Sequence, residues 1–503
     1  MTFPWLTILG LVPLVGGLLL FLPMREASKW LGMFFALLTL GFGIGVAVMY
    51  TGGADLSVQV PWIRPLGAYW ALGLDGMGLA MVMLTVILTP IVLLVEWRSS
   101  GLAGRWSSQA FFALVLILEG LSVFVFTAND VLLFYLFFEA TLIPMYFLIV
   151  GYGGPKAGRA ALKFLLFSLA GGLIMLASVI GVFVVSASAG RPTYLLSELA
   201  AVPLGGDVGR WLMLGFLIAF IVKAPMVPVH TWLPDAAEQA TPGSATLLVG
   251  VLDKIGTFGM IKFCIGLFPE ASRWVAPAMV VLALVSIVWG ALAAIGSKNM
   301  MRLVSYTSVS HFGFMVLGIY AFTTTSLSGS MFYMLNHGFS TAALFLAVGY
   351  LVSRRGTADI DAFGGIQKVA PVAAGMLMVA ALSSLSLPGM ATFPSEFMVM
   401  SGAFGRYPVI AGLSTLGMVL SAVYALRLYR RPMTGPVNQE AAAPFEGRDL
   451  NVVERFAMVP IIGALLLFGF YPQPAVKLVE PTAQAVMQRV QLADPAPAVE
   501  GVK

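Results

Sequence analysis

Charged residues are scarce in this chain. They make up 10% of its 503 residues, whereas hydrophobic residues make up 59%, and the mean hydropathy is +0.94. A water-soluble globule needs far more polar side chains to cover its surface. The composition therefore excludes a soluble globular protein and indicates a protein whose surroundings are a lipid bilayer.

Cysteine and the common cofactor motifs are also rare or missing. The single cysteine, Cys264, excludes an internal disulfide and an iron–sulfur cluster held by cysteines of this chain alone. No G-x-G-x-x-G follows a strand pattern, and the sequence has no Walker motif, no H-x-x-E-H and no Cys/His cluster. We therefore expect this chain itself to bind no cofactor and no metal ion.

Long apolar runs, in contrast, are abundant. A helix that spans a membrane needs about 20 apolar residues, and about fourteen segments meet this criterion. They lie at residues 4–22, 30–50, 76–96, 108–128, 130–152, 161–187, 211–233, 244–268, 275–296, 303–322, 329–352, 369–404 with a break, 408–428 and 456–471. The sequence predicts an all-α polytopic membrane protein. Its first segment lacks a basic n-region and a cleavage site, so we expect a retained helix rather than a signal peptide.

Basic residues concentrate in alternate loops, and cytoplasmic loops are the ones enriched in Lys and Arg. The loops that this rule places inside contain Arg25, Lys29, Arg98, Arg105, Lys156, Arg159, Lys163, Lys298, Arg302, Arg354, Arg355, Lys368, Arg427, Arg430, Arg431, Arg448 and Arg455. The loops placed outside contain Arg64, Arg191, Arg210, Arg273 and Arg406. We therefore expect a multi-pass protein of the cell inner (cytoplasmic) membrane with both termini on the outer side. Topology also explains the net charge of +5, and nothing indicates nucleic-acid binding.

No linker separates soluble domains, so the sequence predicts one transmembrane domain over residues 1–472 and a polar, flexible tail over 473–503. Two apolar segments contain several prolines and polar residues, at 220–236 and 384–397. Proline removes a backbone donor, so both helices should be broken, which lipid tolerates only inside protein or beside water. Their spacing suggests two inverted repeats of about five helices, near 108–268 and 275–428.

At least five ionisable side chains are candidates for burial within predicted spans, and a charge at the bilayer centre costs about 2.5–3.5 kcal/mol. They are Glu119, Glu139, Lys223, Lys254 and Glu396, with Lys223 and Glu396 each at a break. Burial and a nearby carboxylate act in opposite directions on the proton affinity of a lysine, so such a pair suits proton transfer. The alternative is that buried charges only pin helices together.

The three histidines also lie in or beside predicted spans, and imidazole is a natural proton relay near neutral pH. They are His230 in the first break, His311 and His337, the last two accompanied by Ser, Thr and Asn residues that favour a hydrated path.

The sequence leaves the roles of two further residues open. Lys163 is either a relay or a snorkelling lysine at a helix start, and Asp253 either pairs with Lys254 or faces another direction.

The chain resembles the antiporter-like subunits of respiratory complex I in five stretches: FYLFFEATLIPMYFLIVGYGG, KAPMVPVHTWLPDA, GVLDKIGTFGM, RLVSYTSVSHFGFMVLG and LNHGFSTAALFL. Within that family it is most similar to the M-type members. The similarity rests on the glutamate before LIPMYFLI, on Glu396 in PSEF where L-type and Mrp-type subunits have lysine, and on the lack of a long lateral C-terminal helix.

The resemblance implies fourteen transmembrane helices with two inverted five-helix units, neighbouring antiporter-like subunits as partners, and pumping driven by quinone reduction elsewhere. NADH, FMN, iron–sulfur clusters and quinone would be bound by partner subunits. It also implies roles: Glu139 and Lys223 as the input-side pair, Lys254 as the central lysine, His311 and His337 on the hydrated axis, Glu396 at the exit, and Glu119 as an additional acid.

The sequence departs from the family pattern in two loops. Ala237 and Gln239 stand in WLPDAAEQ where the family often has His and Glu, and Asn299 and Met301 stand where an acidic and basic pair usually precedes RLVSYTS. We therefore expect these four positions to contribute no charge to coupling through loops.

Our hypothesis is a proton-translocating subunit of an NADH:quinone oxidoreductase. Lys223 is protonated and discharged as its interaction with Glu139 changes, and the proton passes by Lys254 and His337 to Glu396. One alternative is a subunit of an Mrp-type or hydrogenase-linked cation/proton antiporter. The other is a structural subunit in which buried charges only hold helices together.

Overall fold

The computed structural model describes residues 3–22, 27–97 and 106–496, and the predicted inside residues Arg25, Arg98 and Arg105 lie outside these ranges. Two compact units divide the chain. Unit 1 comprises Met1–Ala224 and Val251–Trp274, and unit 2 comprises Pro225–Gly250 and Val275–Lys503. The chain leaves unit 1 directly after Lys223 and Ala224, at the first predicted break.

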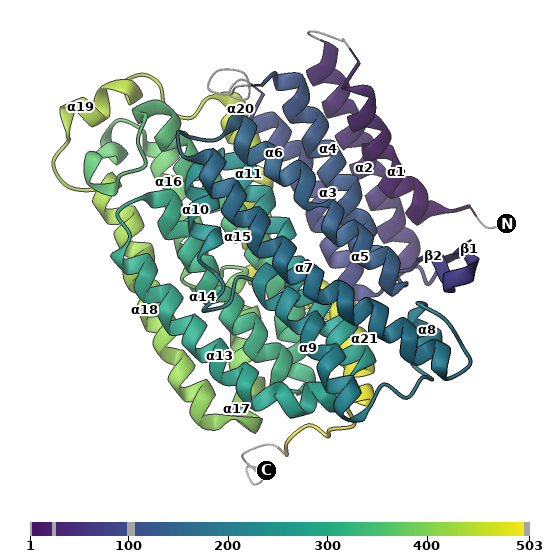
Figure 1. Cartoon of the computed structure of the whole chain (residues 1–503). Coiled ribbons are helices and arrows are strands. Elements are labelled where there is room, and N and C mark those ends of the chain that lie inside the picture. The colour runs from purple at the N-terminus through teal and green to yellow at the C-terminus, as the bar shows by residue number, and fades with distance from the viewer. Residues whose placement is uncertain (1–2, 23–26, 98–105, 497–503) are drawn as a thin grey trace. The chain divides into compact units, whose positions relative to one another are not determined.

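Unit 1 is built mainly from apolar helices, of which α1 to α4 pack side by side (Figure 1). Its elements are α1 (Trp5–Leu19), α2 (Ala27–Thr51), β1 (Val58–Ile63), the 3₁₀ helix η1 (Arg64–Leu66), β2 (Ala68–Leu72), α3 (Gly76–Val95), α4 (Ser108–Thr127), α5 (Val131–Ala140), α6 (Leu142–Tyr152), α7 (Ala157–Ser188), α8 (Leu196–Leu199), α9 (Gly206–Lys223), α12 (Lys254–Gly259) and the π-helix η3 (Met260–Ile265). The π-helix η2 (Leu248–Leu252) and α13 (Pro269–Gly296) cross the boundaries between the units.

The polar segment after α2 contains a β-hairpin that the sequence patterns did not predict. Strands β1 and β2 pair antiparallel, with Val58 opposite Leu72, and Gly67 takes a left-handed conformation in the turn. Asp130 anchors the hairpin, because its carboxylate accepts hydrogen bonds from the backbone N–H of Tyr69 at 2.9 Å and of Leu133 at 2.9 Å. The same carboxylate therefore caps α5 and holds the hairpin beside it.

Unit 2 is arranged around α15, a helix of 32 residues (Thr324–Arg355) that packs against α11, α14, α16, α17, α20 and α21. The other elements are α10 (Trp232–Gln239), α11 (Pro242–Leu247), α14 (Met300–Tyr320), η4 (Ile360–Ala362), η5 (Ile366–Lys368), α16 (Pro371–Ser384), α17 (Thr392–Arg406), α18 (Pro408–Met433), α19 (Gln439–Ala442), η6 (Ala443–Phe445), α20 (Val452–Phe470) and α21 (Gln473–Val490). In the most apolar stretch of α15, 94% of the residues are buried. Its Ser, Asn and His side chains therefore face protein, which is where polar groups in a membrane helix are tolerated.

The membrane character and both broken helices are confirmed. Ten described helices are long and apolar enough to cross a membrane, and two shorter apolar helices are α1 and α16. Helix α9 ends at Lys223 and helix structure resumes at Trp232, whereas α16 ends at Ser384 and α17 begins at Thr392. The total of fourteen spans, the inverted repeats and the side on which the termini lie stay predictions.

Two predicted spans contain local irregularities. Val131–Tyr152 is long and apolar enough to be one span, as predicted, although α5 and α6 meet in a turn at Thr141. The segment 244–268 alternates between α-helix and π-helix. The sequence predicted a flexible tail after Pro472, but Gln473–Val490 form α21, which lies along α15 and buries apolar residues at helical spacing, including Val479, Ala483 and Val486. An amphipathic helix of this kind was hidden by its low overall hydropathy.

Candidate proton-transfer residues

The first break presents a buried lysine at the end of a helix. Pro225 and Pro228 have no backbone N–H, so the helix cannot continue past Lys223 and Ala224. The Lys223 side chain is 1% exposed, and its Nζ has no hydrogen-bond partner among the described residues. Nζ lies 5.4 Å from the ring centre of Phe138 and 5.6 Å from that of Phe164. The faces of two aromatic rings thus stabilise the Lys223 cation, but they provide no group that accepts its proton.

Glu139 lies at the end of α5 and interacts electrostatically with Lys223. Its Oε1 is buried without a hydrogen-bond partner among the described residues. On α7, Gly172 packs directly against the carboxyl group, since a Cβ built there would lie 2.6 Å from Glu139 Cδ. The neighbouring Gly171 allows α7 to approach the backbone of α9. These glycines make room for a carboxylate beside the lysine.

Lys254 and Asp253 extend this group within unit 1. Both side chains are fully buried, and they interact electrostatically with each other. Lys254 is the first residue of α12, which lies between two π-helical stretches, and such distortions are frequent at functional sites. Asp253 also interacts with Lys223. The sequence left the direction of Asp253 open, and the structure makes it an electrostatic partner of both lysines.

Glu119 and Lys163 are two further predicted residues of unit 1. Glu119 is 2% exposed on α4, and neither of its carboxylate oxygens has a hydrogen-bond partner among the described residues. Lys163 is half-buried on α7, one position before Phe164. Its role, as a relay or as a snorkelling residue, stays open.

The second break positions Glu396 in unit 2. Helix α16 stops at Ser384, and Ser386 takes a left-handed conformation with a φ of 56°. This turn directs the Ser386 hydroxyl to Glu396 Oε2, to which it donates a hydrogen bond of 2.5 Å. The hydroxyl of Tyr333 on α15 donates a second bond of 2.7 Å to the same oxygen. Glu396, which is 2% exposed, is therefore a hydrogen-bonded carboxyl group inside the protein.

His311 and His337 lie side by side in unit 2, on α14 and α15. Their ring centres are 5.2 Å apart and the rings are nearly perpendicular, at 86°. His311 Nε2 lies 3.0 Å from the Tyr424 hydroxyl. The Tyr333 ring lies 5.9 Å from that of His311. Polar groups therefore follow one another from His337 through His311 and Tyr333 to Glu396.

His230, the third histidine, is placed at the start of unit 2. The Trp289 ring N–H donates a hydrogen bond of 3.3 Å to His230 Nε2, and the Tyr306 ring lies 6.2 Å away. These contacts are with α13 and α14. These contacts connect the first break to the two helices, and His230 stays an accessory candidate.

Sequence reasoning missed Tyr333 and Tyr424. Tyr333 lies four residues before His337, a spacing that puts two side chains on one face of a helix and could have revealed it. Tyr424 lies on α18, more than 100 residues from His311, and no local pattern marks it.

Charged residues beside the four loop positions that differ from the family pattern form ion pairs. Arg302 on α14 forms ion pairs with Asp235 at 2.7 Å and Glu238 at 3.0 Å, both on α10. These residues flank Ala237, Gln239, Asn299 and Met301 in the sequence. The link between α10 and α14 is therefore ionic even though those four positions carry no charge.

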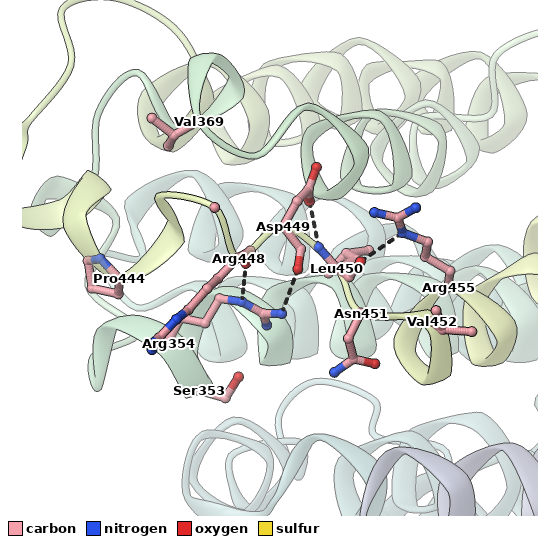
Figure 2. Close-up of a pocket in the computed structure, with 11 residues that line it drawn as sticks. Ser353, Arg354, Val369, Pro444, Arg448, Asp449, Leu450, Asn451, Val452 and Arg455 are labelled. Carbon is pink, nitrogen blue, oxygen red and sulfur yellow. Dashed lines mark hydrogen bonds between the residues drawn. The ribbon is translucent and has the colours of Figure 1, made fainter.

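A separate hollow of about 830 Å³ lies at the ends of α15 and α20 in unit 2 (Figure 2). Arg354 forms a 2.6 Å ion pair with Glu454 there and donates hydrogen bonds to the carbonyl groups of Arg448 and Asp449. The Arg455 side chain donates to the carbonyl of Leu450. These bonds hold the loop before α20, and none of the predicted site residues lines the hollow.

Comparison with known proteins identifies close relatives. Residues 128–422 match the family described as NADH:quinone oxidoreductase/Mrp antiporter, TM. The chain is 44% identical to NADH-quinone oxidoreductase subunit M of Mycobacterium tuberculosis (strain H37Rv), over 99% of this chain and 96% of that one. It is 36% identical to subunit M of Escherichia coli (strain K12), over 94% of this chain and 95% of that one.

Solved structures agree with this assignment. A chain of respiratory complex I from Thermus thermophilus with bound NADH is 32% identical, with a TM-score of 0.87, and the match covers 96% of this chain and 99% of that chain. A chain of the Mrp complex from Dietzia sp. DQ12-45-1b has a TM-score of 0.84 at 21% identity, covering 97% of this chain and 100% of that chain. The latter likeness concerns the fold alone.

Proposed function

Because the chain belongs to the family of antiporter-like M subunits of NADH-quinone oxidoreductase, we propose that it translocates protons as a membrane-arm subunit of such a complex. Its partners are other subunits of that complex, neighbouring antiporter-like subunits among them. Those partners hold NADH, FMN, the iron–sulfur clusters and quinone. This chain contributes buried acids, lysines and histidines, and both of its termini lie on the outer side of the inner membrane.

One observation carries this proposal: Lys223 is buried without a hydrogen-bond partner among the described residues, beside the carboxylate of Glu139. A change of about 1.4 kcal/mol in the interaction of Lys223 with a neighbouring charge shifts its protonation equilibrium about tenfold. A change in the position or protonation of Glu139 therefore decides whether Lys223 keeps its proton. A pair that only pinned two helices would gain from direct hydrogen bonds, which Lys223 lacks.

Further proton-transfer steps follow in each unit. In unit 1 the proton moves from Lys223 to Lys254. In unit 2 the histidine pair His337 and His311 passes the proton to Glu396. The hydroxyl groups of Tyr333 and Ser386 beside Glu396 can both donate and accept hydrogen bonds. Glu119, Lys163 and His230 are accessory residues.

The decisive experiment replaces Glu139 by Gln, which keeps the shape of the side chain and removes its charge. The assembled complex should then lose proton pumping, measured as acidification of membrane vesicles on addition of NADH. The matched control is Glu198→Gln, which changes an exposed carboxylate on α8 of the same unit and should pump normally. Normal pumping by an assembled Glu139→Gln complex would refute the proposal.

A further inference from the structure

Asp253 is a fully buried carboxylate for which the proposed function has no role so far. It is 0% exposed, and neither Oδ1 nor Oδ2 has a hydrogen-bond partner among the described residues. Burying an ionised carboxylate without a hydrogen bond is costly, so a residue that only stabilised the fold would be expected to bind donors. Asp253 instead interacts electrostatically with the two lysines.

The glycines that follow Asp253 pack against the end of α9. Gly256 lies one helical turn after Asp253, so the two are neighbours on the helix surface, and Gly259 lies one turn further along. A Cβ built on Gly256 would lie 2.5 Å from the backbone nitrogen of Ala224, and one built on Gly259 would collide with the Phe220 ring. This face therefore lies against the last turn of α9, which ends with Lys223.

Lys254 follows Asp253 directly and so points to a different side of the helix, because successive residues of an α-helix do not face each other. The Asp253 carboxylate interacts electrostatically with both lysines. With Glu139, the four buried residues form two opposite pairs whose formal charges cancel when all are ionised.

From this arrangement we infer that Asp253 is the proton-transfer group between Lys223 and Lys254. The Lys223 ammonium releases its proton to an Asp253 carboxylate oxygen and becomes a neutral amine. The protonated Asp253 then gives the proton to neutral Lys254, which becomes an ammonium, and Asp253 returns to the carboxylate. One proton and one positive charge move from Lys223 to Lys254, and Asp253 is unchanged at the end. The inference rests on the proposed function and adds an intermediate to it.

The test compares two variants in the complete, assembled complex. Asp253→Asn keeps the size of the side chain but cannot accept a proton, and proton pumping should fall at least about tenfold, because a positioned proton-transfer group contributes about a hundredfold or more. Asp253→Glu keeps a carboxyl group and should restore at least half of the pumping lost. The control Asp207→Asn removes an exposed carboxylate that pairs with Arg210 in the same unit, and should leave pumping unchanged.

The outcomes separate this inference from the function on which it rests. Normal pumping in Asp253→Asn, or equal loss in Asp253→Asn and Asp253→Glu, would overturn the inference. If Glu139→Gln abolishes pumping in the same assay, the proposed function stands in either case. If Glu139→Gln pumps normally, the proposed function itself fails.

A second measurement uses the unmodified complex and covers the case in which Asp253→Asn does not assemble. Dicyclohexylcarbodiimide forms adducts with buried carboxyl groups while they are protonated, and mass spectrometry locates the adduct. Asp253 should be labelled faster when NADH and quinone sustain turnover than when they are absent. No adduct at Asp253, or a labelling rate that turnover does not change, would overturn the inference.

Discussion

At the scale of single residues, the buried ionisable groups of the two units are stabilised in different ways. The side chains of Lys223 and Asp253 in unit 1 interact electrostatically, and Lys223 also has an aromatic neighbour, but their charged groups make no hydrogen bonds among the described residues. Glu396 in unit 2 accepts hydrogen bonds from Tyr333 and Ser386. A group without hydrogen bonds responds readily to a neighbouring charge, whereas a hydrogen-bonded group is held in one position. We therefore interpret unit 1 as the more responsive part and the Glu396 site as an ordered relay.

The hydroxyl of Tyr333 gives a test of that relay. Tyr333→Phe removes one of the two hydrogen bonds to Glu396 and leaves the ring in place. Losing a partner of a buried acceptor costs about 1–3 kcal/mol, so we expect pumping to slow about fivefold or more while the complex stays assembled. The measurement is the initial rate of vesicle acidification per NADH oxidised.

The matched control is Tyr429→Phe, which removes a hydroxyl bonded to the side chain of Gln367 and should not alter pumping. Wild-type pumping in Tyr333→Phe would show that its hydroxyl is not needed by the Glu396 relay.

At the scale of elements, the breaks and the glycines of neighbouring helices position the charges. Helix α9 ends at Lys223 because proline follows soon after. The turn after α16 brings the Ser386 hydroxyl to Glu396. On α7, Gly172 leaves the space that the Glu139 carboxyl group occupies. The helix backbones thus determine which side chains meet, before any charge is considered.

Gly172→Ala tests this role of α7 without changing a charge. The new methyl group would overlap the Glu139 carboxyl group, the end of a flexible side chain, so the helices should still pack while the carboxyl group turns away from Lys223. We expect an assembled complex whose pumping falls about tenfold, the effect of losing about 1.4 kcal/mol of interaction.

Gly158→Ala is the control in the same helix, because a Cβ there meets nothing within 4 Å. It should pump normally and be slightly more stable, since alanine favours the helix over glycine by about 0.5–1 kcal/mol. Equal pumping by both variants would contradict the proposed position of Glu139.

At the scale of the whole molecule, each unit contains its own set of buried ionisable residues and part of a broken helix. Unit 1 contains the lysines with Glu139 and Asp253, and unit 2 contains the histidine pair with Glu396. Under the proposed function, one unit would take up a proton and the other would release it. As a subunit of NADH-quinone oxidoreductase, the chain has other subunits of that complex as partners.

Purification of the tagged chain from mild detergent tests this assignment. We expect subunits that oxidise NADH to co-purify, together with NADH:quinone electron transfer in the isolated complex. Small antiporter subunits alone, without that activity, would instead support the Mrp-type or hydrogenase-linked alternative. Mass spectrometry of the purified material distinguishes the two results.

Local chemistry made much of this protein predictable from its sequence. Apolar runs indicate membrane helices because lipid excludes polar groups, and prolines mark breaks because they lack a backbone donor. An ionisable residue inside such a run is costly wherever it lies, so Lys223, Lys254, Glu139 and Glu396 could be selected without knowing their neighbours. Each of these properties depends on a residue and the few beside it.

Tertiary structure alone decided which of these residues interact. Asp253 was known to precede Lys254, but its approach to Lys223 depends on Gly256 packing against the end of α9. Tyr424 meets His311 only because α18 lies beside α14. Such pairs are distant in sequence, and whether two side chains meet depends on how their helices pack, a property that no single segment of the chain determines.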